Sequence, residues 1–140
     1  MVLRGDARAR PRERGTLVIG LGVDLVEVER VARALERWGG RLVDRLMGET
    51  EATTLPGEPG PRATALALAI AGKEAASKAL GTGWSQGVRW RDVVVDREAP
   101  SVRYLGRALV VAQALGSSGR THARLELRGS LAAGEVRLLS

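Results

Sequence analysis

The sequence lacks cysteine, long apolar runs and any recognisable export signal. With no cysteine among 140 residues, a disulfide framework, a thiolate metal site and a cysteine nucleophile are all excluded. No apolar run approaches the ~18 residues that a membrane-spanning helix needs. The first residues also lack the apolar stretch and small-residue cleavage site of a secretion signal. We therefore expect a cytoplasmic protein that does not associate with membranes.

Lysine is scarce, although the chain is basic overall. Only two of the 22 lysine and arginine residues are lysines, and these two, Lys73 and Lys78, lie in one six-residue stretch. An arginine is effectively always charged, whereas a lysine ammonium is compact and its pKa is readily tuned by its surroundings. The stretch that carries both lysines is therefore a candidate for chemistry.

Positive charge is concentrated at the N-terminus. The formal net charge is +6, and residues 1–16 carry five arginines against two acidic residues, which is half of that excess. This segment has no apolar periodicity, so we expect residues 1–15 to form a mobile arm beside a single domain, residues 16–140. A solvated arm is the preferred interpretation over nucleic-acid binding, because no aromatic residues accompany the arginines.

The pattern of apolar residues predicts a small α+β domain. Composition is globular, with 44% hydrophobic and 27% charged residues. Apolar spacing and glycine or proline boundaries predict the following elements: a strand over residues 16–23, a helix over 24–38, a short helix over 41–47, a loop over 48–62, a helix over 63–80, a strand over 87–96, a helix over 105–115 and a C-terminal antiparallel hairpin. One antiparallel sheet packed with helices accounts for this order.

Asp24 is the first candidate site residue, and it has two interpretations. Asp24 and Glu27 have the spacing of a capping box, which would start the helix immediately after the strand. At a junction between strand and helix, Asp24 could also present one oxygen to a metal ion. Gly20 and Gly22 lack the third glycine of a dinucleotide-binding loop, so they are assigned to close backbone packing.

Glu74 and Lys78 form the second candidate site. Their four-residue spacing places both on one helical face, where an ordinary ion pair would explain them. However, Glu74 continues the apolar stripe of Leu66 and Ile70, so its carboxylate is expected to be partly buried and to need a partner, either Lys78 or a metal. If Asp24 and Glu74 meet, the three side chains suit magnesium-assisted phosphoryl transfer.

Three segments together resemble a known family. Residues 20–30 (GLGVDLVEVER), residues 72–83 (GKEAASKALGTG) and residues 90–92 (WRD) resemble the motifs of holo-acyl-carrier-protein synthases, the small 4'-phosphopantetheinyl transferases. The resemblance implies an enzyme that moves phosphopantetheine from coenzyme A to a serine of an acyl carrier protein. The likeness covers roughly residues 17–122 and leaves the arginine-rich arm outside it.

The resemblance also implies roles for particular residues. Asp24 and Glu74 match the carboxylates that bind Mg²⁺, and Glu74 and Lys78 match the catalytic positions. Contacts to coenzyme A are implied for Lys73, Gly81 and Gly83. Arg124 or Arg128 could supply a substitute phosphate contact where the chain departs from the family, because guanidinium binds phosphate well. The family is typically homotrimeric with active sites between subunits, and its first helix offers arginines to an acidic carrier helix. The corresponding residues here are Arg30, Arg33, Arg37 and Arg45.

Two departures from the family pattern leave an alternative open. An arginine and a phenylalanine of the family are replaced by Ala69 and Ile70, and residues 124–128 read RLELR instead of a serine- and threonine-rich strand. Both segments help hold the nucleotide end of coenzyme A in the family. The alternative is a member that has lost transfer from coenzyme A and serves as a carrier-binding module or a biosynthetic enzyme on another ligand.

Overall fold

The computed structural model describes residues 15–140, so the predicted mobile arm, residues 1–15, lies outside the described residues except for Gly15. The predicted α+β class is confirmed. Within residues 15–140, no helix is both long and apolar enough to cross a membrane. The elements follow one another in this order: β1 (Val18–Glu27), α1 (Val28–Trp38), α2 (Gly40–Leu46), α3 (Glu49–Ala52), α4 (Pro59–Ala79), the 3-10 helix η1 (Trp90–Asp92), β2 (Val93–Asp96), β3 (Ser101–Tyr104), α5 (Gly106–Ala114), β4 (Thr121–Arg128) and β5 (Leu131–Leu139).

The main sheet has three antiparallel strands in the order β1, β5, β4. Gly129 and Ser130 join β4 to β5, and Gly129 has a φ of 58°, in the left-handed region that glycine adopts without strain. This is the predicted C-terminal hairpin, which is confirmed. Because β5 also pairs with β1, the first and last strands of the described chain lie side by side.

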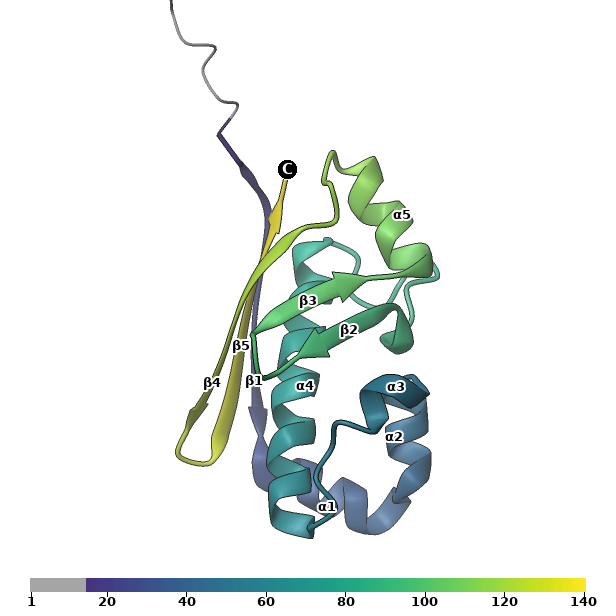
Figure 1. Ribbon diagram of the computed structural model, residues 1–140, viewed down its shortest axis with the longest axis vertical. Coiled ribbons are helices and arrows are strands. Elements are labelled where there is room, and N and C mark those ends of the chain that lie inside the picture. The colour runs from purple at the N-terminus through teal and green to yellow at the C-terminus, as the bar shows by residue number, and fades with distance from the viewer. Residues whose placement is uncertain (1–14) are drawn as a thin grey trace, which may run out of the picture.

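The helix α4 lies along one face of this sheet, and the hairpin of β2 and β3 covers another side of the helix (Figure 1). The remaining helices gather at the two ends of α4. Its contact with the sheet is made of small residues: a Cβ added at Gly20 would lie 2.1 Å from the carbonyl oxygen of Ala79, and one added at Gly22 would lie 1.8 Å from that of Ala75. The glycines therefore let two backbones approach closely, as predicted.

Alanine-rich α4 is buried on nearly every side. Its C-terminal half packs with residues of β2, β3, α5 and the sheet, and its N-terminal half packs with α1 and α2. Leu66, Ala67, Ala71 and Ala75 have no exposed surface. Such a helix is a rigid support, so a polar side chain that it carries is held in a defined place.

One predicted boundary is wrong in a way that changes the site. The sequence pattern predicts that a helix begins at Asp24, whereas β1 continues to Glu27 and α1 begins at Val28. Asp24 pairs with Gly134 and Glu27 with Leu131 in the β1–β5 ladder. Long-range strand pairing thus prevails over the local capping-box pattern, and Glu27, at the N-cap position, makes no side-chain capping bond.

Other differences are smaller. The predicted loop over residues 48–62 contains α3 and the first turn of α4, and the predicted strand over residues 87–96 is reduced to η1 and the four residues of β2. The four-residue strand β3 is missed. Short strands carry few alternating positions, so their periodicity is weak in the sequence.

The outer face of the sheet, which α4 does not cover, exposes several large apolar side chains. Leu21, Val23 and Leu25 of β1 are 57%, 53% and 62% exposed. At the other edge of the sheet, β4 places His122, Arg124 and other polar residues on its exposed positions. Three adjacent large apolar residues on one strand form an exposed patch of the kind that marks an association surface.

Candidate functional site

Asp24 of β1 and Lys78 of α4 meet directly. Side chains alternate along a strand, and since Val23 and Leu25 are exposed on the outer face, Asp24 lies on the face turned toward α4. Lys78 Nζ donates hydrogen bonds to Asp24 Oδ1 at 2.8 Å and to the carbonyl oxygen of Val23 at 3.2 Å. The two sequence motifs, 54 positions apart, are thus joined by an ion pair.

Glu74 completes this group from one helical turn before Lys78. Its side chain is half-buried, and it lines the same cavity of about 510 Å³ as Asp24, together with Glu27, Arg30 and Ile70. Among residues 15–140, no hydrogen bond or ion pair engages the Glu74 carboxylate. Two carboxylates from separate elements therefore face one cavity, and one of them has no protein partner in the described chain.

The residues present fit a magnesium ion. Mg²⁺ takes oxygen ligands and is usually bound through one or two carboxylates, with water and substrate phosphate oxygens in the remaining positions. Asp24 and Glu74 supply such a pair. No group of three or more histidine, cysteine, aspartate or glutamate side chains forms a metal cage within the described part of the chain. The donor set suits an ion shared with a phosphate-bearing substrate rather than a closed structural site.

The environment of Lys78 keeps its ammonium charged. Its side chain is 49% exposed, and the hydrogen bond to Asp24 raises the pKa of Lys78, with the nearby Glu74 carboxylate adding to that effect. An ion pair between Glu74 and Lys78 was one of the predicted possibilities. In the described chain, Lys78 pairs with Asp24 instead. The cavity therefore has a cation at its edge beside two carboxylates.

Lys73 does not occupy the place expected for a coenzyme A contact, and that prediction is corrected here. Its side chain has no exposed surface, and Nζ donates to Glu51 Oε1 at 2.7 Å and to the carbonyl oxygens of Trp90 at 3.1 Å and of Val93. Burial lowers the pKa of Lys73, although the Glu51 carboxylate opposes that shift. All three ammonium protons have partners inside the protein, so none is free for a phosphate.

The other predicted coenzyme A contacts lie apart from this cavity. Gly81 and Gly83 adopt φ values of 76° and 55° in the loop that ends α4, where the Gly83 amide donates to the Ser77 carbonyl oxygen. Arg124 is exposed on β4 between the inward-facing Ala123 and Leu125, so it lies on the outer face of the sheet. Neither the two glycines nor Arg124 is among the residues that line the cavity.

The predicted partner-binding arginines are exposed. Arg30, Arg33 and Arg37 follow one another along α1, and Arg45 lies in the last turn of α2. Arg30 also lines the cavity of Asp24 and Glu74. The Arg37 guanidinium lies 5.0 Å from the ring centroid of Trp38, which is 51% exposed. The arginines of α1 give it a basic surface that begins at the cavity and is interrupted by the exposed Glu29 and Glu36.

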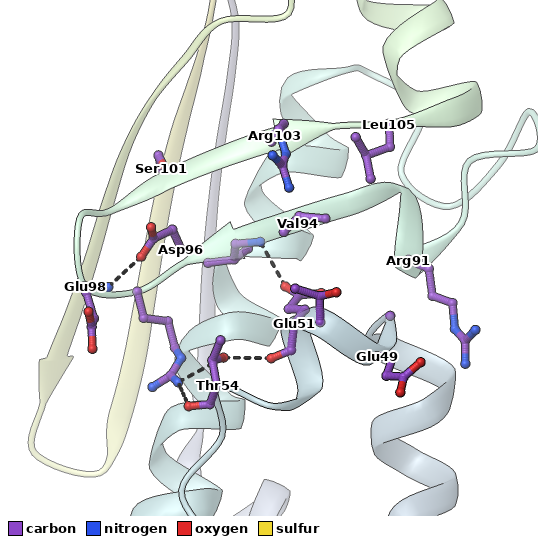
Figure 2. Close-up of a pocket in the computed structure, with 14 residues that line it drawn as sticks. Glu49, Glu51, Thr54, Arg91, Val94, Asp96, Glu98, Ser101, Arg103 and Leu105 are labelled. Carbon is purple, nitrogen blue, oxygen red and sulfur yellow. Dashed lines mark hydrogen bonds between the residues drawn. The ribbon is translucent and has the colours of Figure 1, made fainter.

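A larger cavity, about 760 Å³, lies between α3 and the β2–β3 hairpin (Figure 2). Neither Asp24 nor Glu74 lines it. Its arginines, Arg91, Arg97 and Arg103, are balanced by acidic residues that include Asp96 and Glu98, so its charge does not favour an anion. We assign the candidate active site to the smaller cavity, because both carboxylates line it and one of them, Asp24, is paired with the Lys78 ammonium.

Comparison with known proteins identifies the family of the chain. The family described as the 4'-phosphopantetheinyl transferase superfamily (ACPS) matches residues 20–127. The holo-[acyl-carrier-protein] synthase of Halorhodospira halophila is 47% identical over 105 residues, which is 73% of this chain and 82% of that protein. The corresponding protein of Acidithiobacillus ferrooxidans is 41% identical over 108 residues, 75% of this chain and 84% of that protein.

Solved structures show the same fold. The crystal structure of holo-[acyl-carrier-protein] synthase from Neisseria meningitidis is 25% identical and covers 87% of this chain and 98% of its own, with a TM-score of 0.71. The Helicobacter pylori enzyme, solved in complex with coenzyme A, is 19% identical and covers 84% of this chain and 98% of its own, with a TM-score of 0.70. The likeness extends over nearly the whole length of both structures.

Proposed function

The chain belongs to the holo-acyl-carrier-protein synthases of the 4'-phosphopantetheinyl transferase superfamily, and from this premise we propose that Asp24, Glu74 and Lys78 form its active site. The enzyme transfers phosphopantetheine from coenzyme A to an acyl carrier protein. The alternative, a member that has lost this transfer, has no support among these relatives. The cytoplasmic location expected from the sequence stays a prediction.

One observation carries the assignment of the site. Lys78 Nζ lies 2.8 Å from Asp24 Oδ1, and Glu74 lines the same cavity without a partner in the described chain. Asp24 and Glu74 would hold Mg²⁺, which would withdraw electron density from the pyrophosphate of coenzyme A. Arg30 at the cavity wall adds positive charge where a phosphate would enter.

The chemistry is a phosphoryl transfer. The serine oxygen of the carrier forms a bond to the phosphorus next to pantetheine, and the bond from that phosphorus to the bridging oxygen breaks. The serine loses its proton, and adenosine 3',5'-bisphosphate leaves with the electron pair. Asp24 holds the Lys78 ammonium at the cavity edge, where it neutralises the negative charge that develops on the departing oxygen. Glu74 lines the same cavity and can accept the serine proton through water.

Transfer itself is testable by mass. Incubation of the protein with Mg²⁺, coenzyme A and an apo acyl carrier protein is expected to add one phosphopantetheine group to the carrier, detected by intact-protein mass spectrometry. A carrier whose reactive serine is replaced by alanine is the control and should not gain mass. No mass gain on several apo carriers would contradict the assigned activity.

We further propose that the basic surface of α1 binds the carrier. Replacing Arg33 and Arg37 together by glutamate is expected to raise KM for the carrier at least about tenfold, because opposite charges steer and hold an acidic partner and like charges repel it. The KM for coenzyme A should stay the same, since neither arginine lines the cavity. Steady-state kinetics with each substrate varied in turn measure both values.

The control is Arg120→Glu, because Arg120 is exposed in the loop before β4, away from α1. It changes the net charge in the same direction and should leave KM for the carrier nearly unchanged. Equal effects per reversed charge would show that overall charge, and not the surface of α1, governs carrier binding.

A homotrimer is also proposed, supported by the apolar outer face of the sheet. Leu21, Val23 and Leu25 are each more than half exposed, and burial between subunits would remove this surface from water. The family resemblance implies active sites between subunits, so activity is expected to depend on this association. Val23→Lys is therefore expected to convert the trimer to monomer in sedimentation velocity and to lower the activity. A monomeric, fully active wild-type protein would contradict the proposal.

A further inference from the structure

We propose that the buried ion pair of Glu51 and Lys73 is the positioning device of the active site: it sets the rotation of α4 about its axis so that Glu74 faces Asp24. This inference rests on the proposed metal-binding role of Asp24 and Glu74. Lys73 directly precedes Glu74, and successive residues of a helix project about 100° apart. A constraint on the direction of the Lys73 side chain is therefore a constraint on Glu74.

The ion pair joins four segments of the chain. Glu51 reaches from α3 toward β2, where its Oε2 accepts a hydrogen bond from the Val95 amide at 2.9 Å (Figure 2). Its Oε1 accepts from Lys73 Nζ of α4 at 2.7 Å. Nζ also donates to the carbonyl oxygens of Trp90 in η1 and Val93 in β2. Lys73 is thus held on one side of α4 by α3, η1 and β2.

On its opposite side, α4 contacts the sheet through small side chains. There, alanines at four-residue spacing, Ala71, Ala75 and Ala79, lie against Gly134, Gly22 and Gly20 of the sheet. Alanine and glycine present no long side chains that interlock, so this contact sets the distance between helix and sheet better than it sets their angle. On the hairpin side, Tyr104 adds one hydrogen bond from its hydroxyl to the Ala76 carbonyl oxygen at 2.9 Å. Two charged contacts lie near Glu74: the buried pair of Lys73 with Glu51 and, one turn later, the more exposed pair of Lys78 with Asp24.

Stability alone is a weak reason to bury this pair. Taking two charges out of water costs about as much as their attraction returns, and apolar side chains of similar size often stabilise a protein equally well. Lys73 and Glu51 are 0% and 4% exposed, so they carry the full desolvation cost. Unlike an apolar contact, the pair fixes the orientation of its side chains, because each hydrogen bond requires a defined geometry.

The test measures metal binding directly. In the double variant Glu51→Gln, Lys73→Met both buried charges are removed, so neither is left unpaired, and the glutamine oxygen can still accept from the Val95 amide. We expect this variant to fold and to bind Mn²⁺, a spectroscopic substitute for Mg²⁺, about tenfold more weakly, the size of effect seen when groups that orient metal ligands are lost. Electron paramagnetic resonance of free Mn²⁺ measures the dissociation constant without catalysis. The Mg²⁺ concentration for half-maximal transfer should rise by the same factor.

Two further variants separate positioning from general stability. Val111→Ala removes two buried methyl groups from α5, in the core beside the C-terminal half of α4 but outside the ion pair and the cavity, and should lower the melting temperature without weakening Mn²⁺ binding. Glu51→Gln alone keeps both carbonyl contacts of Lys73, so its Mn²⁺ affinity should lie between those of the wild type and the double variant. If the double variant does not fold, the single variant still tests the inference.

The outcomes are distinct. Wild-type Mn²⁺ affinity in the folded double variant, or in Glu51→Gln should the double variant not fold, overturns the positioning role and leaves the metal site intact. Equal weakening by Val111→Ala also overturns it, because loss of stability would then explain the effect. A wild-type protein that binds no Mn²⁺, with or without coenzyme A, overturns the proposed metal site itself, and the positioning role with it.

Discussion

Glutamine in place of Glu74 is expected to lower the rate of phosphopantetheine transfer about 100-fold or more. The substitution keeps the size of the side chain and removes the negative charge, so one of the two carboxylates that face the cavity no longer binds a hard cation. Loss of one group that stabilises developing charge typically costs a factor of about 100 to 1,000 in kcat. The measurement is kcat at saturating coenzyme A and carrier, with mass spectrometry as the assay.

Folding should not be affected by this substitution. The Glu74 carboxylate has no hydrogen-bond or ion-pair partner within residues 15–140, so the variant should have the wild-type melting temperature. Glu98→Gln serves as the control, since Glu98 is exposed in the connection between β2 and β3 and does not line the site. Its rate should equal that of the wild type. If the Glu74→Gln enzyme keeps more than half of the wild-type rate, Glu74 is not part of the active site.

The second large effect, that of Gly22→Ala, is expected on the free energy of unfolding. An alanine at Gly22 would place its Cβ 1.8 Å from the Ala75 carbonyl oxygen, and both atoms belong to elements that are packed on their other sides. The strand and α4 must therefore separate, and overpacking of a rigid core by one methyl group costs about 3 kcal/mol or more in the free energy of unfolding when the backbone has to move. Urea unfolding followed by circular dichroism, at one fixed protein concentration, measures this value.

Gly57→Ala provides the comparison. Gly57 lies in the loop before α4, and a Cβ built there meets no atom within 4 Å. The change should alter the free energy of unfolding by less than about 1 kcal/mol. If Gly22→Ala is as stable as Gly57→Ala, then β1 and α4 do not approach as closely as described, and the ion pair between Asp24 and Lys78 loses its structural basis.

The longer elements of the fold were predictable because their signals are local. The alanine-rich composition of α4 and the alternation of β4 and β5 are each repeated over several turns or residues. The start of α1 was not predictable in this way. The capping pattern of Asp24 and Glu27 is a local signal for a helix, whereas pairing of Asp24 with Gly134 is a contact between residues 110 positions apart, and this contact decides the conformation.

The candidate site, like the fold, was predictable from the sequence only in part. Family motifs located Asp24, Glu74 and Lys78, and the structure brings these three together. The partner of Lys78 is Asp24 and not Glu74, although Glu74 has the favourable four-residue spacing, because β1 passes beside α4 at this turn. Glu51 was missed. It lies in a segment predicted as loop, and no regular spacing in the sequence links it to Lys73. That both side chains are buried is visible only in the structure.

The scarcity of lysine was the clearest chemical signal in the sequence. It singled out Lys73 and Lys78, but it could not show that one is fully buried and the other half exposed. Sequence alone determined the family, the long helix and the residue types of the site, because these depend on neighbours within a few turns. Only the tertiary structure decided which charges meet. That choice depends on how closely β1, α3 and β2 pack around α4, and packing is set by side-chain volumes from the whole chain rather than by any single segment.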